Sequence, residues 1–385
     1  MAITQYYVDP AIAGDSGTGT IGDPYGDLQY ALNTVTRNAT DGDQFNIKAG
    51  TAEVLAASLT LATYGTTPTT AAPLILRGYT SAANDGGQAE INCNGFTMWA
   101  TTYVALNLID LYIHNGGNNN LVSIGSNGLV WRCHVTKGAS SPSNKTLLNL
   151  SGIDSQVIGC YVHDAGTNGI GIALANRASA AIGCYVTDCP ATGISTGNSQ
   201  GANISGNIVR VTTTAALGIS YQGTGPAIIA NNSVSHSGGG TGVGIRLGAT
   251  SSQWASAWNN IVVGFSGTGG DGIESGGWAY HLGYNAFYNN TANVTVPKIF
   301  IDMTAFDVSL GADPFTDAAN GDFSLTETAK TALRSLGYPP SYLGAAAGSD
   351  PHITIGAMQY GPTPAASGGG GPVIGSRIIR GLGAV

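Results

Sequence analysis

Two stretches of the sequence are nearly identical and lie 24 residues apart. Residues 160–172 read CYVHDAGTNGIGI, and residues 184–195 read CYVTDCPATGIS. A Cys or Asn recurs in this context at successive spacings of 27, 24, 23, 25, 28 and 25 residues. Short Gly-Ile segments follow several of these positions, as in NGIGI, TGIS, LGIS, VGIRL and DGIES. The recurring positions are Cys133, Cys160, Cys184, Asn207, Asn232, Asn260 and Asn285.

Repeats of this length, with strand-like segments and no helix, predict a solenoid of stacked parallel strands. Alternating valines and isoleucines then point inward, and coils stack about 4.8 Å apart. Stacked Asn side chains can hydrogen-bond along such a column. Cys fills the same space as a small apolar residue, so core packing is favoured over disulfides or metal binding. We predict neither a metal site nor a cofactor, because metal clusters prefer C-x-x-C spacing.

The composition restricts the partners of the protein. Of 385 residues, 43% are hydrophobic and 9% are charged, and glycine occurs 58 times. The net charge of -8 argues against a nucleic-acid partner. No apolar stretch is long enough to span a bilayer, and the start MAITQYYVDP shows no secretory signal. The five cysteines are typical of reduced thiols in a cytoplasm.

Two further segments carry a family resemblance. Residues 6–35, YYVDPAIAGDSGTGTIGDPYGDLQYALNTV, are followed by GDQFNIKAGT; near the end stand DPFTDAANGDFSLTETAKTAL and HITIGAMQ. Together with the repeats, they resemble right-handed parallel β-helix proteins of the pectate-lyase-like superfamily over most of residues 4–360. The resemblance implies an all-β right-handed parallel β-helix with a short N-terminal capping helix and a flexible C-terminal tail. It specifies no activity, because this fold hosts many functions.

The chain divides into five predicted segments. Residues 1–50 form an N-terminal strand and a capping helix around residues 28–35, and residues 51–300 form the coils. Residues 301–360 close the solenoid with a short helix near residues 328–336. Residues 361–371 read as a flexible Gly/Pro/Ser linker. Residues 372–385 form an apolar tail that either frays or docks on a partner; its docking residues would be Val373, Ile374, Arg377, Ile378, Ile379, Arg380 and Leu382.

Catalytic candidates are sparse. Pectate lyases need carboxylates that hold Ca²⁺ and a basic residue, and polygalacturonase-like proteins need Asn-Thr-Asp, Asp-Asp and Gly-His-Gly; the sequence shows none of these patterns. Four side chains follow the inward valine of different coils, namely Lys137, Asp164, Asp188 and His236. Asp164 and Asp188 hold equivalent positions, and two carboxylates about 5 Å apart would suit a retaining glycosidase. Turn formation is the favoured interpretation of both.

Other candidates carry less weight. Asp271 and Glu274 form an alternative carboxylate pair. The six histidines are scattered and share no motif. Solvent-facing aromatic side chains can stack on sugars, and stacked packing is the competing interpretation. The candidates are Tyr161, Tyr185, Trp254, Trp258, Trp278 and Tyr280.

The fold, the absence of an export signal and the unpaired cysteines together favour a virion protein that is assembled in a host cytoplasm. We expect a non-catalytic capsid or tail decoration protein of a phage, anchored by its tail to other virion proteins. It would be a homo-oligomer, for example a trimer, without nucleic-acid or membrane partners. The alternative is a tailspike-like protein that binds a host surface glycan or degrades a polysaccharide as a hydrolase or lyase. A bacterial surface protein exported by an atypical route is the third option.

Overall fold

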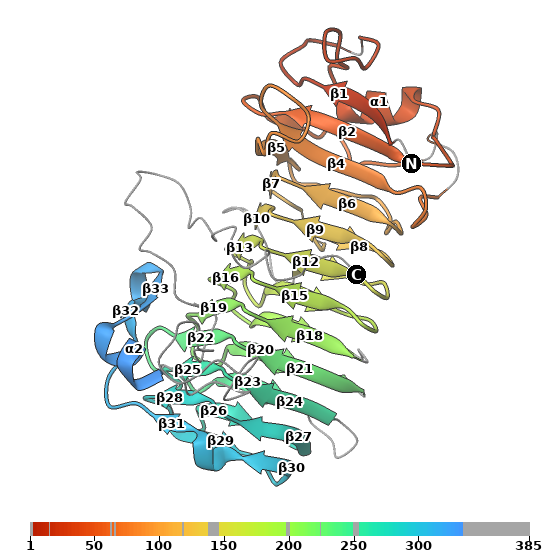
Figure 1. Ribbon diagram of the computed structural model, residues 1–385. Coiled ribbons are helices and arrows are strands. Elements are labelled where there is room, and N and C mark those ends of the chain that lie inside the picture. The colour runs from red at the N-terminus through yellow and green to blue at the C-terminus, as the bar shows by residue number, and fades with distance from the viewer. Residues whose placement is uncertain are drawn as a thin grey trace. The chain divides into compact units, whose positions relative to one another are not determined.

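The computed structural model describes residues 3–333, except residues 15, 62–63, 65–66, 118, 138–145, 198–200, 224 and 249–253. Short parallel strands stack in coils and form three sheets, as Figure 1 shows. The parallel β-helix predicted from the sequence is therefore confirmed. The chain forms two compact units, Met1–Ala180 and Ala181–Val385, which we describe separately.

In the first unit, the coils contribute strands to two parallel sheets, and from β8 onward to a third. The first sheet contains β1 (Thr4–Val8), β2 (Asp43–Lys48), β4 (Leu74–Tyr79), β6 (Leu106–Ile109), β9 (Leu129–Trp131) and β12 (Gln156–Ile158). The second contains β3 (Glu53–Val54), β5 (Ala89–Asn92), β7 (Leu111–His114), β10 (His134–Thr136) and β13 (Tyr161–His163). The third contains β8 (Val122–Ile124), β11 (Thr146–Leu150) and β14 (Ile170–Leu174). Strand β15 (Ala180–Ile182) lies at the boundary between the units.

The second unit repeats this arrangement. Its first sheet contains β18 (Ala202–Ser205), β21 (Pro226–Ala230), β24 (Trp254–Trp258), β27 (Trp278–Gly283) and β30 (Lys298–Met303). The second contains β16 (Tyr185–Thr187), β19 (Ile208–Val211), β22 (Ser233–His236), β25 (Ile261–Val263), β28 (Ala286–Tyr288) and β31 (Val308–Ser309). The third contains β17 (Thr192–Thr196), β20 (Leu217–Tyr221), β23 (Val243–Leu247), β26 (Asp271–Glu274) and β29 (Ala292–Thr295).

Helical segments occur near both ends of the described chain. Helix α1 (Leu28–Thr34) begins at Asp27, whose carboxylate accepts a hydrogen bond from the Tyr30 amide. It buries Leu28, Ala31 and Leu32, as expected for the predicted capping helix. The 3₁₀ turn η1 (Thr304–Phe306) follows β30. An antiparallel hairpin then forms from β32 (Phe315–Asp317), the 3₁₀ turn η2 (Ala318–Asn320) and β33 (Asp322–Leu325), and α2 (Glu327–Leu333) follows it.

The recurring Cys and Asn positions line the buried corner that each coil makes before its second-sheet strand. All five cysteines are buried, and none of them forms a disulfide. In the second unit the backbone N–H groups of Asn207 and Asn232 donate hydrogen bonds to the side-chain oxygens of Asn232 and Asn260 respectively, at 2.9 and 3.0 Å. Asn260 donates in the same way to Asn285, and Asn285 donates to Asp307. Each side chain thus satisfies a buried backbone N–H group of the coil before it.

The residue before each of these positions explains the Gly and Asn that precede them in the sequence. It adopts positive φ at every corner, from 53° at Arg132 to 67° at Gly206. Gly and Asn tolerate this left-handed conformation best, and so VIGCYV, ISGNIV and AWNNIV all form the same turn. The repeat is therefore a turn motif as much as a packing motif.

Candidate functional site

The two predicted aspartates occupy turns and are both engaged in polar contacts. Asp164 and Asp188 have φ of 55° and follow β13 and β16 respectively. Asp164 accepts a hydrogen bond from Nδ1 of His163 at 2.6 Å. Asp188 accepts two from the Arg210 guanidinium at 2.8 and 3.1 Å. This geometry is typical of turn residues, which the sequence favoured for both positions.

Arg210 connects Asp188 to the C-terminal hairpin. Its Nη1 atom donates to the Ala319 carbonyl oxygen at 2.5 Å, and its Nε atom donates to the Thr187 hydroxyl at 2.8 Å. The Phe323 ring packs edge-on against Tyr185 nearby, with the centroids 5.9 Å apart. Asp188 therefore orients an arginine that holds η2 against β16 and β19, and its charge is already compensated.

His236 and Lys137, unlike the two aspartates, are buried. His236 lines a cleft of about 480 Å³ that Ser235, Tyr288, Asp313 and Ala319 also border. Its Nδ1 atom accepts the Gly240 amide proton and its Nε2 atom faces the Thr213 carbonyl at 2.9 Å, so the ring is held as the neutral Nε2–H tautomer. The Lys137 side chain is fully buried in the first unit. Both side chains are therefore part of the buried interior of the coils.

A cluster of rings covers the outer face of the second sheet in the first unit. We define the imidazole–phenol ladder as Tyr112 and His114 on β7, His134 on β10, and Tyr161 and His163 on β13. Its rings stack with centroids 4.4 to 4.8 Å apart. The side chains alternate with Ile113, Val135 and Val162, which are fully buried on the inner face. Parallel register thus brings together three of the six histidines, which share no sequence motif.

Hydrogen bonds connect the ladder to a carboxylate at each end. The Nε2 atom of His134 lies 2.6 Å from Nε2 of His163, and the opposite nitrogen of His163 faces Asp164. At the other end, Nε2 of His114 lies 2.9 Å from the Glu90 carboxylate. In the tautomer in which the Nδ1–H group of His163 donates to Asp164 and its Nε2 atom accepts, the Nε2–H group of His134 donates to His163. That assignment leaves a lone pair on Nδ1 of His134.

The protonation states of the ladder suit general acid–base chemistry. Burial, with smaller contributions from the neighbouring His163 and His114, lowers the pKa of His134 to about 4. His134 is therefore a neutral base at pH 7. Burial, together with the Glu90 carboxylate, raises the pKa of the Tyr112 phenol, which keeps its proton. A neutral imidazole and a protonated phenol thus stack with their centroids 4.5 Å apart.

Two arginines add positive charge to the same coils. The Asp110 carboxylate lies 2.6 Å from Nη2 of Arg132 and 3.5 Å from Nε of Arg77, so one negative charge faces two positive charges. The Arg132 guanidinium also lies over the Trp131 ring, 4.2 Å from its centroid, and its side chain is 41% exposed. Arg132 precedes His134 by two residues. Its side chain is partly exposed, while its guanidinium is already paired with Asp110.

The other sequence candidates fall into separate surroundings. Of the aromatic candidates, Trp254, Trp278 and Tyr280 gather on one face of the second unit, while Trp258 stacks on His281. Glu274 forms an ion pair with Arg246 at 3.1 Å. Within the described ranges, no group of three or more His, Cys, Asp or Glu residues is placed to hold a metal ion. Across the same residues, no helix is long and apolar enough to cross a bilayer.

Comparison with known proteins places the fold. No protein-family model matches the sequence, and no curated protein is significantly similar to it. The structure of pectate lyase Pel9A superposes with a TM-score of 0.59 at 13% identity, over 94% of this chain and 98% of that one. A rhamnogalacturonan lyase gives 0.46 at 12% identity, over 86% of this chain and 98% of that one. A GH136 lacto-N-biosidase from Eubacterium ramulus gives 0.45 at 14% identity, over 80% and 68%. The likeness to pectate lyase Pel9A therefore shows that this chain has a parallel β-helix fold.

Proposed function

We propose that this protein binds an acidic polysaccharide on the outer face of β7, β10 and β13 and cleaves it by β-elimination. The observation that carries the proposal is the relay from Asp164 through His163 to the neutral His134, stacked on a protonated tyrosine. The likeness to pectate lyase Pel9A over nearly the whole chain supports a polysaccharide as the substrate. These observations favour the glycan-degrading alternative over a purely structural role.

The ladder favours elimination over hydrolysis. A glycoside hydrolase needs a pair of carboxylates on either side of the scissile bond. Here Glu90 and Asp164 both face a histidine. The groups that remain are an imidazole and a phenol, which can remove a proton from carbon and protonate a leaving oxygen.

Each group has a defined role in the proposed step. Nδ1 of His134 takes the C5 proton of a uronate residue, the C4–O4 bond breaks, and a C4=C5 double bond forms. The departing oxygen takes the Tyr112 proton, and the proton on His134 then returns to the tyrosine. While His134 is charged, the Asp164 carboxylate stabilises it through His163, as the acid does in a catalytic triad.

The charge of the substrate completes the mechanism. A uronate carboxylate pairs with the partly exposed Arg132 side chain, whose guanidinium also holds Asp110, and this contact withdraws charge from the carbon that loses its proton. The same carboxylate raises the pKa of His134 toward neutrality, because a nearby negative charge favours imidazolium. An acidic substrate thereby increases the strength of its own base.

The experiment is a direct assay for cleavage. The purified full chain is incubated with polygalacturonate, alginate and hyaluronan, and the ultraviolet absorbance of the unsaturated uronate product is followed. We expect absorbance to rise on at least one of these substrates. New reducing ends without that absorbance would show hydrolysis and refute the elimination step.

The virion role predicted from the sequence stays a prediction. Its anchoring peptide, residues 372–385 with the docking residues from Val373 to Leu382, lies outside the described residues. The predicted oligomer and its virion partners likewise stay predictions. A glycan-cleaving β-helix on a phage tail would unite both proposals, since a spike must bind the host surface before it degrades it.

A further inference from the structure

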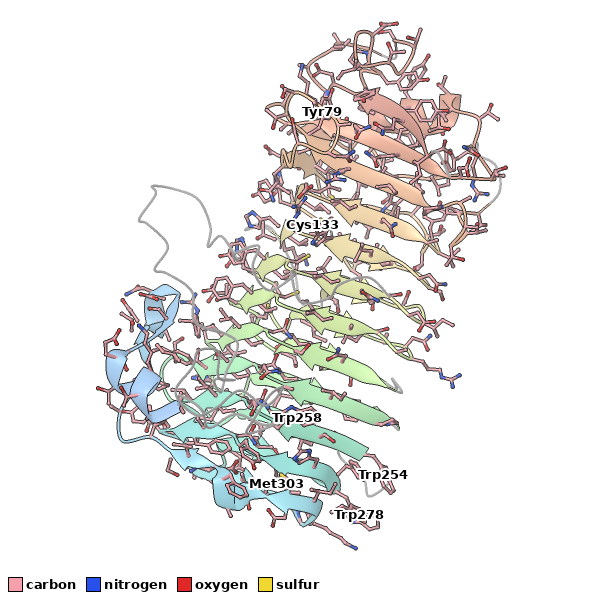
Figure 2. The ribbon with its side chains drawn as sticks, viewed as in Figure 1. Tyr79, Cys133, Trp254, Trp258, Trp278 and Met303 are labelled. Carbon is pink, nitrogen blue, oxygen red and sulfur yellow. The ribbon has the colours of Figure 1, made fainter. Side chains whose placement is uncertain are left out.

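The second unit carries exposed aromatic rings that the ladder chemistry does not use. We define the aromatic platform as Trp254 on β24, Trp278 and Tyr280 on β27, and Lys298 and Phe300 on β30. Trp254 and Tyr280 are each 43% exposed, and Phe300 is 44% exposed. Figure 2 shows Trp254 and Trp278 together at one end of these strands. Exposed apolar clusters of this kind mark binding surfaces on soluble proteins.

The rings of the platform lie at contact distance and face different directions. Trp254 and Phe300 stack with an interplanar angle of 13° and centroids 5.3 Å apart. Trp278 meets Phe300 edge-on at 67°, and Tyr280 tilts against Trp254 at 38°. Sugar rings bind proteins by laying their C–H faces on such aromatic faces. The platform thus offers stacking surfaces at more than one angle, as a twisted glycan strand requires.

A strand irregularity lies at one of the rings. The register between β24 and β27 shifts after the pair Ala255 and Ala279, so that Ser256 pairs with His281. Tyr280 is the extra residue, and its ring is exposed while His281 is buried. Bulges commonly re-aim a side chain beside a functional site.

The single cation of the platform indicates the charge of its ligand. The Lys298 ammonium lies 4.7 Å from the Trp278 ring centroid and 5.1 Å from that of Phe300. A carboxylate on a stacked sugar would reach this ammonium. A two-fold contact with a second copy would instead bring the two Lys298 side chains together, on chains whose net charge is -8. Charge complementarity therefore favours an acidic glycan over self-association.

We propose that the aromatic platform is a second, non-catalytic binding site for an acidic glycan strand. Trp254, Tyr280 and Phe300 stack on the sugar rings, and Lys298 pairs with a sugar carboxylate. The choice of an acidic glycan rests on the proposed function, but the site itself stands on its own geometry. It would hold a polysaccharide independently of any cleavage at the ladder.

The test measures ligand binding at the tryptophans of the aromatic platform itself. The full chain is labelled with 5-fluorotryptophan, which gives each of its five tryptophans a ¹⁹F resonance. Galacturonate oligomers and their neutral methyl esters are titrated separately. We expect saturable shifts of Trp254 and Trp278, with unchanged resonances for buried Trp99. The acid should bind about tenfold more tightly than the ester, and Lys298→Met should abolish that preference.

Matched variants separate binding from folding. Phe300→Ala should weaken binding about tenfold, whereas Phe300→Tyr, which keeps the ring, should retain it. Phe306→Ala is the control, because Phe306 is 56% exposed and stacks on Tyr284 away from the platform. Unshifted Trp254 and Trp278 resonances would overturn the inference, even if the ladder cleaves the polymer. Loss of self-association in Phe300→Ala with unchanged glycan affinity would also overturn it. Saturable shifts without cleavage would leave the platform standing and refute the proposed lyase activity.

Discussion

The Nε2 atoms of His134 and His163 lie 2.6 Å apart on neighbouring strands of one sheet. At that distance the two imidazoles share one proton, and Asp164 fixes which nitrogen of His163 carries the other. The arrangement orders two side chains that the chain supplies 29 residues apart. Parallel stacking thus assembles on one face a relay that no local motif encodes.

The pH dependence of the proposed cleavage should follow from the protonation state of His134. Because burial lowers its pKa to about 4, the acidic limb of kcat/KM should lie well below the ordinary histidine pKa of about 6.5. The acidic limb of kcat should lie at a higher pH than that of kcat/KM, because the negative charge of the bound substrate raises the pKa of His134. Asp164→Asn removes a charge that raises the His134 pKa, so its limb should move further down. Profiles of rate against pH on the best substrate measure the wild-type limbs of kcat/KM and kcat and the limb of the variant. A wild-type kcat/KM limb near pH 6.5 would contradict the assignment of His134 as a buried neutral base.

Asp188→Asn should leave turnover unchanged and loosen the C-terminal hairpin. The substitution removes the charge that orients Arg210, whose guanidinium holds the Ala319 carbonyl. Hydrogen exchange of β32 and β33 should accelerate about tenfold, corresponding to about 1.4 kcal/mol of local stability. Lys330→Met, which breaks the exposed ion pair with Glu327, serves as control and should change neither quantity. Loss of cleavage in Asp188→Asn with intact exchange protection would assign Asp188 a catalytic role instead.

Asn232→Ala should destabilise the second unit by about 3 kcal/mol. The Asn232 side chain accepts hydrogen bonds from the Asn207 amide and side chain, and it donates to the Ile204 carbonyl. All these partners are buried and would lose their bonds. Urea unfolding measures the change, with Asn203→Ala on the half-buried outer face of β18 as control, expected within about 0.5 kcal/mol of wild type. Equal effects of the two substitutions would show that the Asn column is not a stabilising ladder.

Asp307→Asn should stabilise the protein above pH 7. Asp307 accepts the Asn285 amide at the end of the Asn column, and burial raises its pKa to about 7. A raised pKa means that the carboxyl group stabilises the fold fully below its unfolded pKa near 4, and that this stability is lost as pH rises toward 7. Asparagine keeps the acceptor without the charge. The difference in unfolding free energy between variant and wild type should therefore grow from pH 4 to pH 8, and a constant difference would contradict the buried carboxyl.

The sequence predicted the fold because the repeat is encoded locally. Each coil needs a left-handed corner before a buried small or amide residue, and this requirement produces the Gly-Cys and Asn-Asn pairs. The spacing of those pairs gives the coil length. The recurring glycines and asparagines therefore predict where each coil turns and how long it is.

The ladder could not be predicted in the same way. His114, His134 and His163 meet only through the register of β7, β10 and β13, and the coils between them differ in length. Asp164 and Asp188 were candidates because they hold equivalent positions on neighbouring coils. In the structure Asp164 contacts His163, whereas Asp188 contacts Arg210. Outward-facing positions of consecutive coils are the signal that would have found the ladder: Glu90, Tyr112, His134 and Tyr161 occupy one column.

The most direct test of the account compares wild type with His134→Gln in the assay for unsaturated uronate product. Glutamine keeps a hydrogen-bonding side chain at the site but cannot act as a base. We predict that wild type cleaves an acidic polysaccharide and that the variant, with unchanged thermal unfolding, is slower by about 100-fold or more. Wild-type turnover that survives the substitution would contradict the assignment of the imidazole–phenol ladder as the active site.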